Sequence, residues 1–447
     1  MKAKTLSSFI LLLAVAACQQ IEPTARAAVS FSVTPSAVSN TYSGTLTLQV
    51  GGLTNGETVV VQEFLDANTN GVIDSGDWLV QQFQLTDGLA SVIGGIVNSN
   101  VPGDTTPTNA AITAQMSFLT SGPALAMGAR YLYRLSSPAD HFTPPLTTPF
   151  DVTNVPYSQS ITGNVVCSGT NVPNAVVMVF SGVAFESTPI GGAVANNAGA
   201  YRIPLPPGTY NLMAFKTNYV ADAGTAPNVA LGSGGTTATN ISLIPATCSI
   251  SGRVRDAANA SLGLAGLLVF PQSINNQVAM INTDTNGNFS ARVTASQWDI
   301  SYDDMQLPAF GYARVQNGPR VDTTTGSVAN VTLAFPKGTA LIYGTVKDTQ
   351  NHPLAGGWLA AWDNADQYES MGLTDQIGNY AVALIANTWT LQTDNTSPAF
   401  ANYIFPQPSG ITATCPRSAV RRSLSRCKGQ KWLNHQCASN IGCARCR

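Results

Sequence analysis

The side chains best suited to chemistry are concentrated in one stretch, residues 66–77. It offers carboxylate, amide and main-chain oxygens at Asp66, Asn68, Asn70, Val72, Asp74 and Asp77. Ca²⁺ takes about six to eight oxygen ligands, whereas Mg²⁺ needs a tighter octahedron and Zn²⁺ selects His or Cys, which this stretch lacks. The three carboxylates repel one another until a cation neutralises them. The sequence therefore predicts a structural Ca²⁺ site, with the Val72 carbonyl as one ligand.

The spacing of these donors resembles the EF-hand-type calcium loop, in which Gly71 would allow the sharp bend. Asp77 stands where that loop usually carries a bidentate Glu, so we expect contact through one oxygen or through water. The flanking residues 59–64 and 78–80 alternate as strands do, so the loop is more similar to calcium loops inserted in bacterial β-sandwich domains. The alternative is a hairpin turn rich in Asn, Asp and Gly that binds no ion.

The composition favours a multi-domain β protein. The chain has 447 residues, a net charge of −2, 10% charged and 44% hydrophobic residues, with 39 Gly and 26 Pro. This length predicts three or four domains, and the apolar content is sufficient for folded cores. Frequent turn residues favour strands over helices. The lack of a basic excess argues against a nucleic-acid partner.

The N-terminus is predicted to direct export. Lys2 and Lys4 precede an apolar run, 6–17, that is too short for a membrane-spanning helix and suits a signal peptide. The run ends Val15-Ala16-Ala17-Cys18, which resembles a bacterial lipobox. This resemblance implies a signal peptide over 1–18 and a lipid on Cys18.

The predicted location follows from that lipid. Gln19 is not the Asp that resembles an inner-membrane retention signal, so the expectation is a protein anchored in the bacterial outer membrane, facing the cell surface or the periplasm. The alternative is an ordinary signal with cleavage near Ala25 or Ala28 and a secreted protein.

Three segments repeat one pattern at a spacing of about 90 residues. Each opens with an apolar-x-Gly-x-Val strand, at 161–165, 250–254 and 342–346. Each continues to a turn that ends in an aromatic residue, at Tyr201, Phe289 and Tyr380. A later strand carries another aromatic residue, at Tyr210, Trp298 and Trp389, and the two tryptophans are predicted to lie in cores. Alternation with a period of two and no sustained helical period predict an all-β chain of tandem sandwiches.

These repeats resemble the carboxypeptidase regulatory-like domain, a transthyretin-like β-sandwich of the carbohydrate-binding-like fold group. The resemblance implies three sandwiches, at 158–246, 247–337 and 338–412, and implies a spacer, folding aid or binding module rather than a reaction. Residues 29–157 do not fit the repeat and are predicted to form an immunoglobulin-like sandwich. Its strands are expected at 30–34, 44–50, 58–64, 79–85, 111–119, 129–135 and 148–152. We expect four units in a row with short linkers, and a long polar loop near 98–109.

Two tryptophans could recognise sugar. Trp358 and Trp362 lie four apart in a predicted strand and therefore on one face, close to polar residues. Aligned positions in the other repeats are apolar, which favours packing against a neighbouring sheet or unit. Stacking on a glycan is the alternative interpretation.

Other reactive side chains are few. Cys167 and Cys248 could form a disulfide that ties the ends of the first repeat, since an oxidising envelope permits one. His141 and His352 are predicted in solvated turns, and the acid pairs Asp303–Asp304 and Asp363–Asp366 in solvated loops. No nucleophile elbow or paired-His motif occurs, so the sequence predicts a protein that is not an enzyme.

The final segment, 413–447, differs in composition from the rest. It carries eight of the 22 basic residues, no acidic residue and five of the eight Cys. A zinc knuckle or a basic anchor would use these residues, but only Cys443 and Cys446 have the spacing of a metal-binding pair. The third repeat loses its resemblance where this segment begins, which favours a shifted reading frame or a mis-called end. The last strand of the third repeat is then expected to be missing, leaving that repeat incomplete.

Together these features predict a calcium-stabilised, extended surface protein that binds a partner without chemical turnover, with polysaccharide as one candidate ligand. The alternatives are a structural scaffold that presents another envelope protein and an accessory module for a secreted hydrolase.

Overall fold

The structure is a computed structural model that describes residues 28–118, 127–182, 189–393, 397, 399–405, 409–413, 419–421, 424–425 and 442–443. The predicted signal peptide, Cys18 and most of the basic tail lie outside the described residues. The predicted all-β class is confirmed, because the described chain folds into tandem sandwiches. Two short helical turns, η3 (Ala223–Thr225) and α1 (Leu307–Phe310), are the helices in these ranges. None of the described helices has the length and apolar character needed to cross a membrane.

Residues 29–157, called unit 1 below, form a two-sheet sandwich. One sheet has the order β1 (Ser30–Thr34), β3 (Thr45–Gly51), β8 (Ile112–Ser117). The other has the order β2 (Ala37–Ser39), β10 (Leu146–Thr153), β9 (Ala129–Ser136), β4 (Thr58–Leu65), β5 (Trp78–Thr86). The short strand β2 pairs in parallel with β10, while the other pairs are antiparallel, which is an immunoglobulin-like arrangement. All seven predicted strands are present, whereas β2 and the hairpin of β6 (Val92–Ile93) and β7 (Ile96–Val97) were not predicted.

The three repeats, called repeats 1 to 3 below, share one topology. In each, the first strand lies between an antiparallel neighbour and a parallel final strand. These trios are β15 (Ala200–Pro204), β11 (Ser160–Cys167) and β20 (Ile241–Pro245); β25 (Asn288–Val293), β21 (Cys248–Asp256) and β29 (Val328–Phe335); and β33 (Asn379–Leu384), β30 (Ala340–Lys347) and β36 (Ala419–Arg421). In repeat 1, β19 (Thr236–Ala238) also pairs with β11, and β12 (Thr170–Asn171) extends that sheet.

A second sheet covers each trio. In repeat 1 it runs β14 (Pro189–Val194), β13 (Val176–Phe180), β16 (Gly208–Phe215), β18 (Asn228–Leu231). In repeat 2 it runs β23 (Gln277–Val278), β22 (Leu268–Ser273), β26 (Gln297–Tyr302), β28 (Arg320–Asp322), with β24 (Ile281–Asn282) also on β22. In repeat 3 it runs β32 (Tyr368–Leu373), β31 (Trp358–Asp363), β34 (Asn387–Thr393), β35 (Ser409–Ala413).

The glycine of the recurring apolar-x-Gly-x-Val motif has a physical reason. A Cβ atom at Gly163 would lie 1.6 Å from the Thr239 carbonyl oxygen, and one at Gly252 would lie 2.0 Å from that of Val331. Only glycine lets the final strand approach the first so closely. Across the sheet, Gly252 pairs with Phe289, the aromatic residue of the recurring turn. The glycine of the motif and the aromatic residue of the turn therefore lie opposite each other on paired strands.

The two predicted core tryptophans are fully buried. Trp298 and Trp389 each have 0% exposed surface. Their indole N–H groups donate to the carbonyls four residues earlier, to Thr294 at 3.2 Å and to Ile385 at 3.0 Å. The prediction that these tryptophans form the cores is confirmed.

The prediction of short linkers between separate units is wrong at two places, because sheets continue across the boundaries. β17 (Tyr219–Asp222) of repeat 1 pairs with β23 of repeat 2, joining their strands into one sheet. β27 (Arg314–Val315), on the chain of repeat 2, pairs with β32 of repeat 3. Main-chain hydrogen bonds therefore hold the repeats in a fixed relation.

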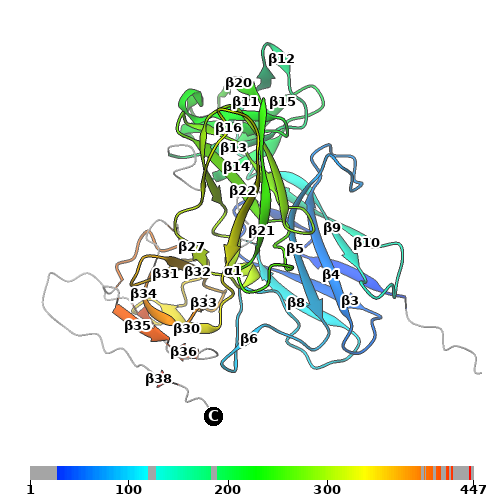
Figure 1. Cartoon of the computed structure of the whole chain (residues 1–447), viewed down its shortest axis with the longest axis vertical. Helices are drawn as coiled ribbons and strands as arrows, with labels where there is room; N and C mark the ends of the chain where they lie inside the picture. Colours follow the sequence, from blue (N-terminus) through cyan, green and yellow to red (C-terminus); the bar gives the residue numbers. More distant parts are fainter. Residues whose placement is uncertain are drawn as a thin grey trace, which may run out of the picture.

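The units also do not stand in a row. Figure 1 shows unit 1, with β3 to β10, beside repeat 2, while repeat 1 and repeat 3 lie at opposite ends of the molecule. The predicted polar loop near 98–109 reaches repeat 3, where the buried Asn100 amide donates to the Ala381 carbonyl and accepts from the Leu373 amide at 3.3 Å. The first and last units are therefore in contact.

The predicted loss of the last strand of repeat 3 is also wrong. β36 and β37 (Leu424–Ser425), from the basic segment, pair in parallel with β30. They occupy the place that β20 and β29 hold in the other repeats. β38 (Gly442–Cys443) pairs with β36. A shifted reading frame stays a prediction.

Candidate functional site

The predicted calcium loop connects β4 to β5 in unit 1, and its first ligand is buried. Asp66 has 0% exposed surface, and its two carboxylate oxygens accept from the Asn70 amide at 3.1 Å and the Gly71 amide at 2.9 Å. Gly71 has φ +75°, in the left-handed region that glycine tolerates best. The loop therefore bends around the Asp66 carboxylate, as its sequence predicts.

The other predicted donors turn toward the same centre. The side-chain amides of Asn68 and Asn70 both donate to Asp74 Oδ2, each at 2.8 Å. The Asp77 carboxylate accepts from the Ala67 amide at 3.1 Å and the Asp74 amide at 2.9 Å. The two side-chain N–H groups thus stabilise the Asp74 carboxylate with their partial positive charges. A bound cation would do the same with a full positive charge. The Asn side chains can present oxygen instead by rotating.

The carboxylates of the loop lie close together, and the pKa values of two of them are shifted. Burial, with the nearby charges of Asp74 and Asp66, raises the pKa of Asp77 above its usual value. Hydrogen bonds from Gly76, Asn68 and Asn70 lower the pKa of Asp74. Within the described ranges, no three His, Cys, Asp or Glu side chains gather into a metal site by themselves. A calcium ion would therefore depend on the Asn oxygens and the Val72 carbonyl as well, a donor set of the hard oxygens that Ca²⁺ prefers.

The same loop touches repeat 2. Ile73 packs against a small cluster of Phe64 and Leu79 from unit 1 and Ala265 from repeat 2. Trp78, which follows the loop, packs against the large core that unit 1 and repeat 1 share. The geometry of this loop is therefore linked to the junctions between units.

Trp358 and Trp362 lie on one face of β31, opposite to the core residues Leu359 and Ala361. Trp358 is only 7% exposed, as expected for packing, and it offers no face to a sugar ring. Trp362 is half-buried and is paired across the sheet with Glu369. The two rings therefore do not form an exposed platform.

The predicted disulfide is wrong, because Cys167 and Cys248 are both free. Val166 pairs with Ser242, so the register places Cys167 beside Leu243, five residues before Cys248. At about 3.3 Å per residue, this offset exceeds the Cα separation that a disulfide spans.

His141 was predicted to be solvated, but the structure shows that it is buried. Its Nδ1 lies 2.6 Å from Glu57 Oε2, and the two side chains are 8% and 4% exposed. Glu57 also accepts from Thr54 and Ser137, so the group ties together two loops of unit 1, the one before β4 and the one after β9. His352 is exposed as predicted, with 69% of its side chain accessible beside Asp348.

Two acids predicted in solvated loops are buried. Asp363 is 1% exposed and accepts from the Gln367 and Tyr368 amides, so its role is to close a turn. Asp303 is 5% exposed and follows β26 at the edge of a cavity. The Asp303–Asp304 doublet at a strand end was the sequence signal for this position, but the cavity beside it also needs Met178, Phe180 and Pro189 of repeat 1, which the sequence does not reveal.

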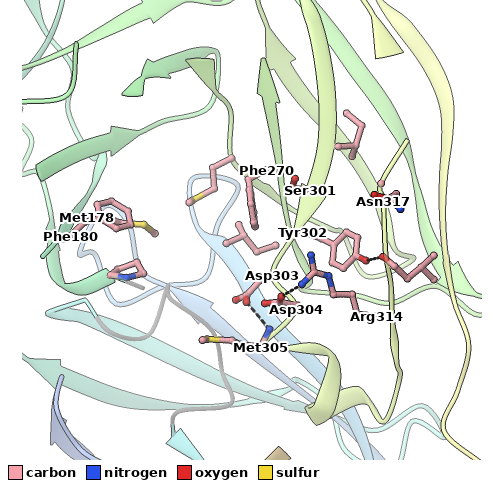
Figure 2. Close-up of a pocket in the computed structure, with 16 residues that line it drawn as sticks. Met178, Phe180, Phe270, Ser301, Tyr302, Asp303, Asp304, Met305, Arg314 and Asn317 are labelled. Carbon is pink, nitrogen blue, oxygen red and sulfur yellow. Dashed lines mark hydrogen bonds and ion pairs between the residues drawn. The ribbon is translucent and has the colours of Figure 1, made fainter. Parts of the chain in front are cut away.

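The cavity lies between repeats 1 and 2 and has a volume of about 380 Å³. Figure 2 shows Met178 and Phe180 of β13 on one side and Phe270 of β22 on the other. Asp303, Asp304 and Arg314 provide its polar end. Apolar walls with a few polar groups at a junction between domains are the usual form of a small-molecule site.

The polar end of the cavity is electrostatically unbalanced. Arg314 Nη1 lies 2.7 Å from Asp304 Oδ2 and 3.1 Å from Glu369 Oε2. Asp303 Oδ1 accepts from the Met305 amide at 3.0 Å, while Oδ2 is buried and has no hydrogen-bond partner. Burial and the charge of Asp304 raise the pKa of Asp303 to about 8.

Comparison with known proteins adds little beyond the fold. No family model and no curated protein matches the chain. Similar solved structures include the Bacillus anthracis TIE protein, 12% identical over 91% of this chain and 76% of that chain, with a TM-score of 0.20. The major pilin subunit BcpA of Bacillus cereus is 11% identical over 61% and 99%, with a TM-score of 0.18. A streptococcal ancillary pilin is 11% identical over 63% and 92%, with a TM-score of 0.19. TM-scores this low carry no argument about function.

Proposed function

We propose that this protein is a non-enzymatic component of the bacterial cell envelope, anchored in the outer membrane through a lipid on Cys18, that presents a rigid set of sandwiches for binding or spacing a partner. The observation that carries the proposal is the continuous main-chain pairing between units, β17 with β23 and β27 with β32. Independent modules on flexible linkers do not share sheets, whereas a spacer or presenting scaffold gains from fixed geometry.

Two further contacts support a rigid scaffold. Gln306 is 2% exposed and donates from its amide to the Val80 carbonyl of unit 1 at 3.0 Å. Its side-chain oxygen accepts from the Leu268 amide at 2.8 Å. One buried side chain thus joins unit 1 to repeat 2, and buried polar groups of this kind are costly to separate.

Lipid anchoring is tested in cells. The full-length protein, expressed in a Gram-negative host with an alkyne-bearing fatty acid, should incorporate label and fractionate with the outer membrane. Cys18→Ala should abolish the label, while Cys167→Ala, which changes a cysteine in the folded region, should retain it. A wild-type protein that is secreted without label would contradict the lipid anchor.

Rigidity is tested in solution. Small-angle scattering of the mature chain should fit one compact arrangement in which unit 1 contacts repeat 3. A scattering curve that needs a broad ensemble of extended shapes would contradict the rigid scaffold.

Calcium binding belongs to the same proposal. The ion would be held by Asp66, Asn68, Asn70, Val72, Asp74 and Asp77. It would stabilise the loop and, through Ile73, the contact with Ala265 of repeat 2. Its role would be structural, since the loop lies at the junction between unit 1 and repeat 2.

Polysaccharide recognition is a second candidate function. Trp362 is half-buried on the outer face of β31, in register with Glu369 and Thr390, so an aromatic face and polar neighbours lie together. Binding on a glycan array should then be lost in Trp362→Ala and retained in Trp362→Phe. Equal binding by both variants would remove this residue from any sugar site.

A further inference from the structure

The cavity between repeats 1 and 2 is formed by faces that each sandwich turns away from its own core. Met178 and Phe180 lie on the outer face of β13, and each is 1% exposed. Leu268 and Phe270 lie on the opposing face of β22. Because the second sheets of two repeats meet here, the site exists only in the assembled pair.

The polar end of this cavity contains an unsatisfied acid. Asp303 is 95% buried, since 5% of its surface is exposed, and its Oδ2 atom has no hydrogen-bond partner among the residues that the structure describes. Its neighbour Asp304 is already matched by Arg314, which also contacts Glu369. Among the described residues that line the cavity, Arg314 is the cationic side chain, and it is engaged by these two acids. A buried carboxyl oxygen without a donor is destabilising.

We propose that this cavity binds a compact, largely apolar molecule that carries a protonated amino group, with the apolar part between Phe180 and Phe270 and the amino group donating to Asp303 Oδ2. Such a ligand fits both ends of the site. Its apolar part packs against the aromatic and methionine side chains of the cavity. Its amino group supplies a positive charge to Asp303, because Arg314 is already shared between Asp304 and Glu369.

Other ligand classes fit less well. An anionic ligand would meet the Asp303 and Asp304 carboxylates at the polar end, and Arg314 has no free charge to offset them. A sugar needs many hydrogen-bond partners, whereas Met178, Phe180, Leu268 and Phe270 offer none. This site is independent of the scaffold function and of Trp362.

The proposal is tested with a matched pair of probes, 4-phenylbutylamine and 4-phenyl-1-butanol, by calorimetry on the mature full chain. The amine should bind about tenfold more tightly than the alcohol, since hydrogen bonds that involve a charged group are stronger than those between neutral groups. Asp303→Asn keeps the shape of the side chain and should remove this preference. Asp299→Asn, on the same strand with 47% of the side chain exposed beside Arg320, should leave it unchanged.

A second variant tests the location. Ser301→Phe adds a ring at the cavity wall and should weaken both probes at least tenfold, because Ser301 lines the site and is not fully buried. Failure of both probes to bind the wild type, a preference that survives Asp303→Asn, or full binding in Ser301→Phe would each overturn the proposal. Circular dichroism and the melting temperature establish that each variant is folded.

Discussion

Gly266 of repeat 2 lies directly against the main chain of Gln81 in unit 1, so closely that a Cβ atom at Gly266 would be 2.7 Å from the Gln81 Cα. Gly266 also has φ +77°, so the position demands glycine for two reasons. The close approach brings Ala265 against Phe64 and Leu79. The junction between unit 1 and repeat 2 is therefore packed to main-chain contact.

Gly266→Ala should loosen this junction. The added methyl group has to displace main-chain atoms, which costs about 1–3 kcal/mol beyond the backbone strain. Gly169→Ala is the matched control, since Gly169 has φ +80° with open space around it. In thermal unfolding, Gly266→Ala should lower the melting temperature clearly more than Gly169→Ala. Equal effects would mean that only backbone strain matters.

Calcium should raise the melting temperature of the wild-type protein. The three carboxylates at Asp66, Asp74 and Asp77 repel one another, and a bound cation adds its binding free energy to folding. Asp74→Asn removes one charged ligand and should abolish the difference between excess calcium and excess chelator. Ser75→Ala, at the exposed neighbouring position, should keep it. An identical wild-type melt in calcium and in chelator would reject the site.

The sequence was informative where a contact is local. Period-two alternation located the strands of unit 1, and the recurring glycine located the first strand of each repeat. The loop at 66–77 also folds as its residues imply, because the hydrogen bonds that its side chains make join residues no more than ten apart. In these cases the interacting residues are close in the chain, so their spacing carries the information.

The sequence was uninformative where a residue is defined by a distant partner. Asn100 is a loop residue by every local criterion, yet it is buried against repeat 3, 281 residues away. Asp303 belongs to a doublet of acids that is indistinguishable from a solvated one by sequence, yet it is buried at the edge of a cavity that residues of repeat 1 help to line. The pairing of β17 with β23 involves two residues on each strand, too few for any pattern. Burial created between units therefore has no local signature.

Because of Glu63, the free energy of unfolding should decrease as the pH rises. Glu63 shares the core face of β4 with Val61 and Leu65, is 0% exposed, and has the Tyr133 hydroxyl as the polar group that partly offsets its burial. Burial raises its pKa from 4.5 to about 8. Between these values the unfolded chain releases the proton while the folded chain retains it, so the folded state loses stability as pH rises.

Glu63→Gln removes this titration. It should be more stable than the wild type at pH 8 by on the order of 3 kcal/mol, and the advantage should shrink toward pH 4.5. Asp151→Asn, whose side chain is 42% exposed, should show no such gap. Urea unfolding at the two pH values measures the difference, and a gap independent of pH would show that Glu63 is ionised in the folded protein.

Glu57 should have the opposite pH dependence. Burial opposes its ionisation, but hydrogen bonds from the Thr54 hydroxyl and amide and the contact with His141 outweigh it, so its pKa lies below the usual 4.5. The folded state therefore holds the ionised form more readily than the unfolded chain does. This stabilisation is present above about pH 4.5 and is lost as pH falls through the lower folded-state pKa.

Glu57→Gln should accordingly be less stable than the wild type at pH 7 by about 1–3 kcal/mol, because it loses charged hydrogen bonds at a buried site. The difference should shrink in acid, where the wild-type carboxyl is itself protonated. Asp140→Asn is the control, since Asp140 directly precedes His141, is exposed, and has φ +55°, which Asn adopts readily. Urea unfolding at pH 7 and pH 3 measures both variants. A Glu57→Gln deficit that is as large at pH 3 as at pH 7 would show that shape rather than charge holds the Glu57–His141 contact.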